Sequence, residues 1–189
     1  MHIYRSSLLR FADDGSATYD EDGLLATAPG ADGRERVAAA GSWQALSPQL
    51  LGRAGGEVVV HHLPGRIIAP GFVDLHIHYP QTDVIGAPAP GLLPWLENYT
   101  FPHESRFHDR AYADGVADFF MDELLRNGVT TALAFATSHP ASVDAIMTAA
   151  QKRSMRMIAG KVLQDRNSPD GVRDDTEQSL IDTETLIQR

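Results

Sequence analysis

Asp74, His76 and His78 are spaced two residues apart within the segment PGFVDLHIH, which begins at residue 70. In a β-strand this spacing places the three side chains on one face and the apolar residues between them on the other, where they can pack against helices. Ionisable groups that face an interior are costly unless they are paired or bind a metal ion. Two imidazoles at this spacing can converge on one zinc ion. Asp74 can orient one of these ligands by hydrogen bonding without contacting the metal itself. The segment therefore predicts a metal site at His76 and His78, with two partly solvated histidines as the alternative.

The other histidines are weaker candidates for a functional site. His61 and His62 are adjacent, so their side chains point to opposite faces, and surface or packing roles are predicted for both. His103 and His108 lie in or near a long predicted loop, where histidines are usually solvated. His139 follows a predicted strand, the place where barrel enzymes carry site residues, and has a solvated or capping role as its alternative.

The segment from residue 79 to residue 108 contains five prolines and is predicted to be a long loop. A structureless loop of this length inside a domain is unusual unless it is functional. Trp95, Tyr99 and Phe101 within it can form a stacking platform for an aromatic ligand. The alternative is that these rings anchor the loop to the rest of the domain.

From residue 70 onward strands and helices alternate, which predicts parallel βαβ units and an α/β fold. The strands are expected at 72–78, 129–136 and 155–163, and the helices at 109–126, 140–153 and 175–189. The last helix has no glycine or proline stop, and three parallel strands leave a sheet edge uncovered. Both features predict that the chain is truncated.

Residues 1–69 have a different character, because short β-like runs alternate with turn signals. Strands are expected at 3–11, 23–28, 57–62 and 66–69, with a turn at 63–65, and little structure is assigned to 34–56. This pattern predicts a small β-sandwich or sheet that precedes the βαβ units.

Composition excludes several classes of function. The 189 residues carry a formal net charge of −9, which argues against nucleic-acid binding, since that needs clustered cations. The absence of cysteine excludes disulfides, cysteine nucleophiles and zinc deaminases with cysteine ligands. No apolar run approaches the ~18 residues of a membrane span, and the first residues do not form a secretory signal. A cytoplasmic protein without a membrane partner is therefore expected.

The segment PGFVDLHIH resembles the first metal-binding strand of the amidohydrolase superfamily. The stretch that continues from it, YPQTDVIGAPAPGLLPWLENYTFPHESRF, is similar to the guanine deaminases within that superfamily, and NGVTT and FAT look like their second strand. The resemblance implies a (β/α)₈ barrel, of the TIM type, with a small composite β-sandwich domain. On this view residues 1–69 belong to the small domain and residues 70–189 are the first three β/α units of an incomplete barrel.

The resemblance also implies an activity and its residues. The implied reaction is zinc-dependent hydrolytic deamination of guanine to xanthine and ammonia, a step of purine catabolism. His76 and His78 match the first two zinc ligands, and Gln81 matches an amide that hydrogen-bonds the purine. The implied substrate-binding residues are His78, Tyr79, Pro80, Gln81 and Trp95.

The expected chemistry needs a zinc-activated water that attacks the carbon bearing the amino group, and a carboxylate that carries a proton to the leaving nitrogen. In this family that glutamate and the remaining ligands come from later strands. No catalytic residue is therefore expected in this chain, the acid–base glutamate is expected beyond Arg189, and the chain alone is expected to be inactive.

Two alternatives stay open at this point. The chain is a non-catalytic, truncated binding or interaction module, or it is an amidohydrolase that acts on another purine, a triazine or a cyclic amide. A homodimer of the full-length protein is expected only by analogy with the family.

Overall fold

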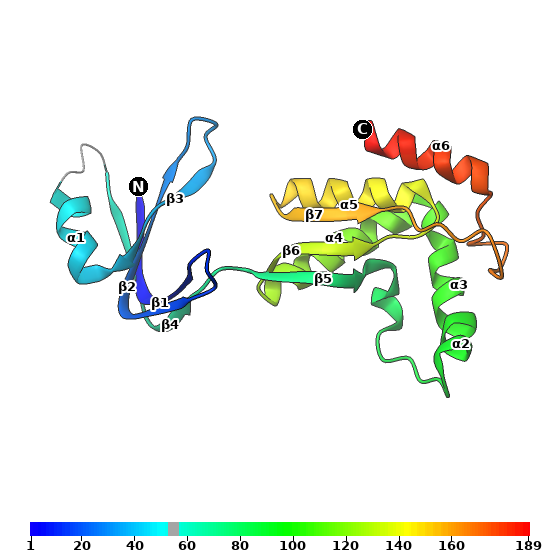
Figure 1. Ribbon diagram of the computed structural model, residues 1–189, viewed down its shortest axis with the longest axis horizontal. Helices are drawn as coiled ribbons and strands as arrows, with labels where there is room; N and C mark the ends of the chain where they lie inside the picture. The colour runs from blue at the N-terminus through cyan, green and yellow to red at the C-terminus, as the bar shows by residue number, and fades with distance from the viewer. Residues whose placement is uncertain (53–56) are drawn as a thin grey trace. The chain divides into compact units, whose positions relative to one another are not determined.

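The computed structural model describes residues 1–52 and 57–189. The described chain divides into two compact units, Met1–Pro70 and Gly71–Arg189 (Figure 1). Each unit has its own cluster of buried apolar side chains. No helix in the described part of the chain is both long and apolar enough to cross a membrane.

The first unit is a four-stranded sheet with strand order β3-β2-β1-β4. Its elements are β1 (His2–Phe11), β2 (Ala17–Pro29), β3 (Glu35–Ser42), α1 (Trp43–Gly52) and β4 (Val59–Ile68). β1, β2 and β3 pair antiparallel, whereas β4 runs parallel to β1. Ile3, Leu24 and Ala26 form the buried centre, and Trp43 and Leu46 of α1 pack against it.

The expectation of little structure at residues 34–56 is wrong for most of that segment. β3 and α1 occupy it, and the last four residues, 53–56, lie outside the described residues. β3 is formed by hydrogen bonds to β2, along a run rich in alanine and glycine that carries no local strand signal. Antiparallel pairing with the preceding strand β2 therefore determines this strand.

The turn expected at residues 63–65 does not separate two strands, because β4 is continuous through it. The register between β1 and β4 shifts at this point, and Gly65 has a φ of 70°. The Ser6 hydroxyl group on β1 hydrogen-bonds the main-chain carbonyl groups of Leu63 and Arg66, which the ladder leaves free. The turn residues thus form a bulge inside one strand.

His61 on β4 has the packing role that its sequence position predicts. Its ring stacks on Tyr4 with centroids 4.8 Å apart, and its Nε2 lies 3.1 Å from Nδ1 of His2. His62, the neighbouring residue, is exposed.

The second unit contains a parallel sheet with strand order β5-β6-β7, as the alternation of strands and helices predicts. Its main elements are β5 (Phe72–His78), α4 (Arg110–Arg126), β6 (Val129–Phe135), α5 (Pro140–Lys152), β7 (Arg156–Gly160) and α6 (Thr176–Ile187). Figure 1 shows α4 and α5 along one face of this sheet. Their apolar sides bury against Ala132 and Ala134 of β6 and form the larger of the two cores.

The expected long loop at residues 79–108 is instead a chain of short helical turns. They are η1 (Tyr79–Val84), α2 (Leu92–Trp95), η2 (Leu96–Thr100), α3 (Phe101–Glu104) and η3 (Ser105–His108). Pro80 and Pro102 stand in the first turns of η1 and α3, where a missing main-chain N–H removes no helical hydrogen bond. Two of the five prolines that suggested a loop therefore begin helical turns.

Candidate functional site

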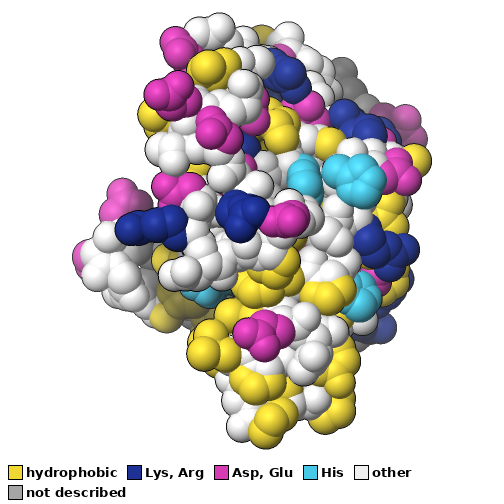
Figure 2. Space-filling view, turned by 90° about the vertical axis from the view of Figure 1, so that its right-hand side faces the viewer, with side chains coloured by type: hydrophobic (Ala, Val, Ile, Leu, Met, Phe, Trp, Pro, Cys, Tyr) yellow, Lys and Arg dark blue, Asp and Glu magenta, His cyan; other side chains and the backbone are white. Residues whose placement is uncertain are grey.

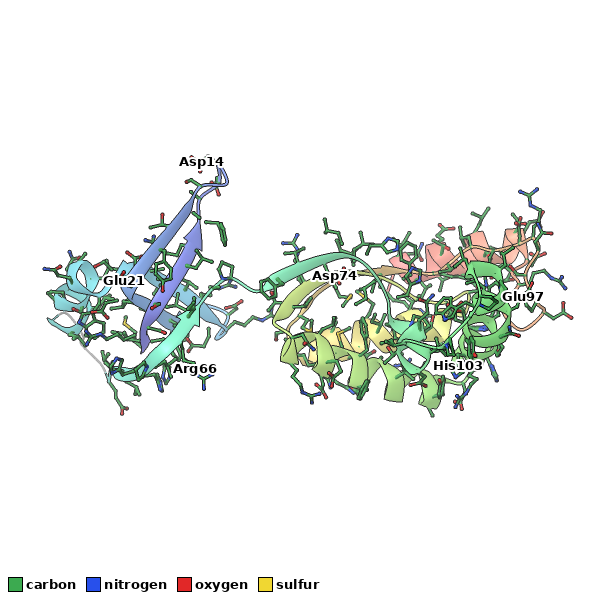
Figure 3. The ribbon with its side chains drawn as sticks, turned by 90° about the horizontal axis from the view of Figure 1, so that it is seen from below. Asp14, Glu21, Arg66, Asp74, Glu97 and His103 are labelled. Carbon is green, nitrogen blue, oxygen red and sulfur yellow. The ribbon has the colours of Figure 1, made fainter. Side chains whose placement is uncertain are left out.

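The site strand β5 contains a bulge next to its histidines. Asp74 pairs with Ala132 and Ile77 with Ala134, so three steps along β5 match two steps along β6. Within the bulge, the Asp74 carboxylate accepts a hydrogen bond of 3.0 Å from the main-chain N–H of His76. Figure 3 marks Asp74 on this strand. Asp74 thus fixes the backbone that carries the first histidine.

The strict alternation of faces expected along β5 is interrupted at this bulge. Ile77 packs against the core, but the side chains of Val73 and Leu75 are 58% and 70% exposed. Because β5 forms an edge of the sheet and bulges after Asp74, these two residues do not reach the helices. Of the three residues expected to share a face that can pack against helices, Ile77 does so in this structure, and Val73 and Leu75 are exposed.

His76 and His78 lie side by side, with ring centroids 5.2 Å apart. Phe135, the last residue of β6, stacks on His78 at 4.6 Å with an interplanar angle of 12°, and lies 5.2 Å from His76. Burial, and then the nearby His76, lower the pKa of His78 below its ordinary value. A neutral imidazole keeps a lone pair for a metal ion, so this environment favours the ligand form.

The donor chemistry of this pair suits zinc, which takes imidazole nitrogen readily. Two imidazoles supply half of a tetrahedral ligand set. Across residues 1–52 and 57–189, no three His, Asp or Glu side chains lie close enough together to hold a metal ion. The pair therefore fits part of a zinc site and needs further donors to complete it.

The helical turn η1 begins directly after His78 and carries Gln81. Three hydrogen bonds hold this turn: the Tyr79 hydroxyl donates to the carbonyl of Ser142 at 2.6 Å, the Thr82 hydroxyl to the carbonyl of Tyr79 at 2.6 Å, and the Tyr112 hydroxyl to Asp83 at 2.8 Å. Tyr79 and Pro80 are buried, and Gln81 is partly exposed. The predicted purine-binding amide thus projects from a fixed turn, three residues after the histidine pair.

Glu104, at the end of α3, is a functional candidate that the sequence analysis missed. Its side chain is buried, with 7% of the residue exposed, and α3 packs against η1, the turn that carries Gln81. Burial raises the pKa of Glu104 to about 7, and the nearby Gln81 side chain opposes that rise. An acidic residue in a segment expected to be a solvated loop gave no signal of such burial.

Trp95, Tyr99 and Phe101 lie in consecutive helical turns, and each is half buried. The ring that is buried most deeply beside η1 is Phe107, which meets the ring of Tyr79 edge-on at 5.3 Å. Figure 2 shows hydrophobic side chains gathered at the lower end of the face shown. The exposed apolar residues of the segment around α2 are Ile85, Leu92 and Leu93.

The remaining histidines of this unit hold local structure. His139 Nε2 lies 3.1 Å from the carbonyl oxygen of Gly171, its ring is edge-on to His108 at 6.0 Å, and burial lowers its pKa. His103 Nδ1 lies 2.9 Å from the carbonyl oxygen of Tyr99, one helical turn earlier. The His139 side chain therefore contacts the segment that follows β7. His139 is the N-cap residue of α5, but its side chain makes no capping hydrogen bond there.

A buried ion pair stands at the end of β7. The Lys161 ammonium group donates to Asp174 at 2.6 Å and to the Ser179 hydroxyl at 3.0 Å, and its side chain is 1% exposed. Strand 155–163 was expected to continue past this lysine, but β7 ends at Gly160. Lys161 also lines a hollow of about 370 Å³ at the ends of β6 and β7. Phe135, which stacks on His78, lines the same hollow.

Comparison with known proteins places these features in context. A family model described as "Amidohydrolase family" matches residues 67–189. Guanine deaminase of Escherichia coli (strain K12) is 46% identical over 169 residues, which are 89% of this chain and 36% of that protein. The solved structure of E. coli guanine deaminase has a TM-score of 0.87 and 41% identity, covering 100% of this chain and 44% of that one.

A second solved structure, guanine deaminase from C. acetobutylicum with bound guanine in the active site, has a TM-score of 0.81 and 30% identity. The match covers 99% of this chain and 42% of that one. The chain thus spans less than half the length of the relatives it matches. These likenesses confirm the predicted fold class, an α/β fold that covers part of a longer amidohydrolase fold.

Proposed function

The chain belongs to the amidohydrolase family, and we propose that it contributes to the hydrolytic deamination of guanine to xanthine and ammonia. One observation carries the proposal. A pair of adjacent imidazoles and a glutamine amide lie within six residues at the end of one strand, in a chain 46% identical to E. coli guanine deaminase. Imidazoles suit the metal, and an amide that donates and accepts suits a purine edge.

We assign His76 and His78 as two ligands of a zinc ion. When bound, such an ion supplies a Lewis acid that lowers the pKa of a water ligand toward about 7. Asp74 holds the main chain of His76, and the stacked ring of Phe135 holds the imidazole of His78. The remaining ligands and the acid–base glutamate are assigned to residues outside 1–189.

The proposed substrate contacts follow the metal ligands along the chain. Gln81 hydrogen-bonds the purine, and the buried Tyr79 and Pro80 hold the backbone from which its amide projects. His78 faces the substrate as well as the metal, and Trp95 contributes an aromatic surface from α2. On this proposal the site selects a planar, polar heterocycle by hydrogen bonds and ring contact.

We also propose the larger arrangement in which this site works. Residues 1–69 belong to a small composite β-sandwich domain, and residues 70–189 supply the first three β/α units of a TIM barrel. The protein acts on a free purine in the cytoplasm, without a nucleic-acid or membrane partner, and the complete protein forms a homodimer.

Metal and guanine binding by the 189-residue chain test the site directly. Zinc binding is measured by isothermal titration calorimetry for the unaltered chain and for His76→Ala, His78→Ala and His62→Ala. Each of the first two is expected to weaken binding at least about tenfold, whereas the exposed His62 in the other unit serves as the control. Equal zinc affinity in all four proteins would overturn the ligand assignment.

Guanine binding to the zinc-loaded chain is then compared for Gln81→Ala and Gln178→Ala. Gln178 is exposed on α6, so only the first substitution is expected to weaken binding. Guanine binding that is absent, or insensitive to Gln81→Ala, would contradict the proposed substrate. Release of ammonia and xanthine from guanine by the same samples measures whether this chain turns the substrate over.

A further inference from the structure

Two further histidines meet on the sheet of the unit Met1–Pro70, which does not contain the site strand β5. His2 lies on β1 and His61 on β4, and Nδ1 of His2 lies 3.1 Å from Nε2 of His61. The ring planes make an angle of 24° and the centroids are 5.4 Å apart, so the rings approach by these nitrogens rather than by their faces. The pair therefore presents two imidazole nitrogens from strands that lie 59 residues apart in the sequence.

The register of the two strands places both histidines on one face of the sheet. β1 and β4 run parallel, with Tyr4 opposite His61. Ile3 is fully buried in the core against which α1 packs, so its neighbours His2 and Tyr4 point to the other face. The Tyr4 ring stacks on His61 at 4.8 Å with an interplanar angle of 15°, which restrains that imidazole. Both histidines are partly exposed, so a dissolved ion can reach them.

The separation of the two nitrogens matches that of neighbouring ligands on one metal ion. Imidazole nitrogen binds zinc at about 2.0–2.1 Å. Two such nitrogens lie about 2.9 Å apart at a right angle and about 3.3 Å apart at the tetrahedral angle, and the observed 3.1 Å falls between these values. An ion can therefore replace the hydrogen bond between the rings when both lone pairs turn toward one point, without separation of β1 and β4.

We propose that His2 and His61 form a binding site for a divalent transition-metal ion of the class that prefers imidazole, which includes zinc, copper and nickel. Each neutral imidazole carries one proton, so binding requires only that these protons occupy Nε2 of His2 and Nδ1 of His61. No third His, Asp or Glu side chain lies close enough to join the pair anywhere in residues 1–52 and 57–189, so water completes the coordination. The ion joins β1 to β4 on the face of the sheet that α1 does not cover.

Such an ion binds the folded unit in preference to the unfolded chain. The pairing of β1 with β4 holds the two imidazoles together, and unfolding separates them. A ligand that binds only the folded state adds to its stability. The site shares no residue with His76 and His78, which belong to the other unit, and it does not depend on the proposed deamination.

Nuclear magnetic resonance of the imidazole nitrogens in the unaltered 189-residue chain tests the site directly. Zinc chloride is titrated at neutral pH, and the ring signals are assigned with single-histidine variants. Nδ1 of His2 and Nε2 of His61 are expected to shift together, whereas the ring of His62 is expected to stay unchanged. The signals of His76 and His78 report separately on the other unit. If zinc leaves either His2 or His61 unshifted, the proposal is overturned, whatever happens at the other pair.

Calorimetry then separates this site from a general affinity of exposed histidines. In a chain that carries His76→Ala and His78→Ala, His61→Phe is expected to weaken zinc binding at least about tenfold. The phenyl ring can keep the stacking on Tyr4 but lacks the nitrogen. His62→Phe is the matched control, because His62 follows on the same strand, is exposed, and points to the opposite face. Zinc affinity that is equal in the two variants contradicts the proposal.

Urea denaturation measures whether the ion joins the two strands. Saturating zinc is expected to raise the urea midpoint of the first unit, which is followed by the fluorescence of Trp43 in a Trp95→Phe background. His61→Phe is expected to abolish this rise, and His62→Phe is expected to preserve it. A midpoint that does not respond to saturating zinc, or a rise that survives His61→Phe, overturns the proposal.

Discussion

Two irregular segments, each following a strand of the parallel sheet, bury one ionisable side chain in opposite ways. The segment after β5 buries Glu104 near the neutral side chain of Gln81, and no cationic group among residues 1–52 and 57–189 pairs with it. The segment after β7 buries Lys161 against the carboxylate of Asp174 at 2.6 Å. The first ionisable group has no countercharge among the described residues, whereas the second has a countercharge within hydrogen-bond distance.

This difference separates a group that can respond to its surroundings from one that holds a fold together. A buried ion with a close countercharge stays ionised, because each charge compensates the desolvation of the other. A buried carboxyl group without one is stabilised in its neutral form, so its charge changes within the range of physiological pH. The comparison predicts a structural role for Lys161 and a site role for Glu104.

Removal of the countercharge at Lys161 is expected to have the largest effect on stability. Lys161→Met leaves Asp174 buried without a cation and is expected to lower the free energy of unfolding by about 3–5 kcal/mol. Urea denaturation is followed by the fluorescence of Trp95 in a Trp43→Phe background, so that only the unit Gly71–Arg189 is observed. A loss below about 1 kcal/mol would show that the ion pair does not hold this segment.

A double substitution distinguishes the unpaired charge from lost packing. Lys161→Met with Asp174→Leu is expected to recover most of the loss, because no charge stays buried. Recovery is incomplete, since Asp174 also accepts a hydrogen bond of 3.1 Å from the main-chain N–H of Gln164. Arg166→Ala is the control: Arg166 lies 3.7 Å from Asp165 at an exposed position, and its removal is expected to leave the midpoint of denaturation unchanged.

Glu104 is expected to make stability depend on pH in the direction opposite to that of a salt-bridged carboxylate. Its folded pKa of about 7 lies above the ordinary 4.5, so the native state holds a proton that the unfolded chain releases between these values. The stabilisation is therefore complete below pH 4.5 and is lost as the pH rises through 7. At about 1.4 kcal/mol per pKa unit, the loss is on the order of 3 kcal/mol.

Glu104→Gln checks this expectation, because the glutamine side chain has nearly the same shape as that of glutamate and cannot ionise. The variant and the parent are expected to be equally stable near pH 5, and the variant is expected to be more stable at pH 8. Urea denaturation at pH 5, 6, 7 and 8 measures the difference, and the exposed Glu97→Gln serves as the control. A difference between parent and variant that stays constant with pH would mean that Glu104 does not titrate in this range.

The contrast between the two segments also explains what the sequence could predict. β5 was predicted with its observed bounds, because alternating apolar and ionisable residues after Pro-Gly are a local strand signal. The juxtaposition of His76 and His78 followed from the same pattern. The bulge after Asp74 could not be predicted, since it depends on the register with β6.

The two buried ionisable groups were missed for different physical reasons. Prolines made the segment of Glu104 look like a loop, although Pro80 and Pro102 begin helical turns there. Lys161 follows an apolar run and was included in a strand, but its partner Asp174 lies 13 residues later. No local pattern encodes a contact of that kind, and composition alone cannot show which charges become buried.

The anchor of the first segment gives a smaller expected effect than either buried charge. Tyr79→Phe removes the hydroxyl group that donates to the Ser142 carbonyl at 2.6 Å, and this buried carbonyl then lacks its side-chain donor. The free energy of unfolding is expected to fall by about 2 kcal/mol, without a change in its pH dependence. Urea denaturation at pH 6 and pH 8 measures the free energy of unfolding and its pH dependence. A changed pH dependence would show that the anchoring of η1 and the titration of Glu104 are coupled.

The smallest effect is expected where the two segments touch. A Cβ atom at Gly171 would lie 2.9 Å from the Cβ of Ser105, so Gly171→Ala forces the segment after β7 away from η3. The expected cost is about 1 kcal/mol in the free energy of unfolding. In a Ser105→Gly background the same substitution is expected to be nearly neutral, whereas Ser105→Ala keeps the obstructing carbon and does not relieve it. If Gly171→Ala costs the same free energy of unfolding in both backgrounds, the contact between the two segments does not limit stability. Glu104 and Lys161 then belong to two segments that stabilise the sheet independently.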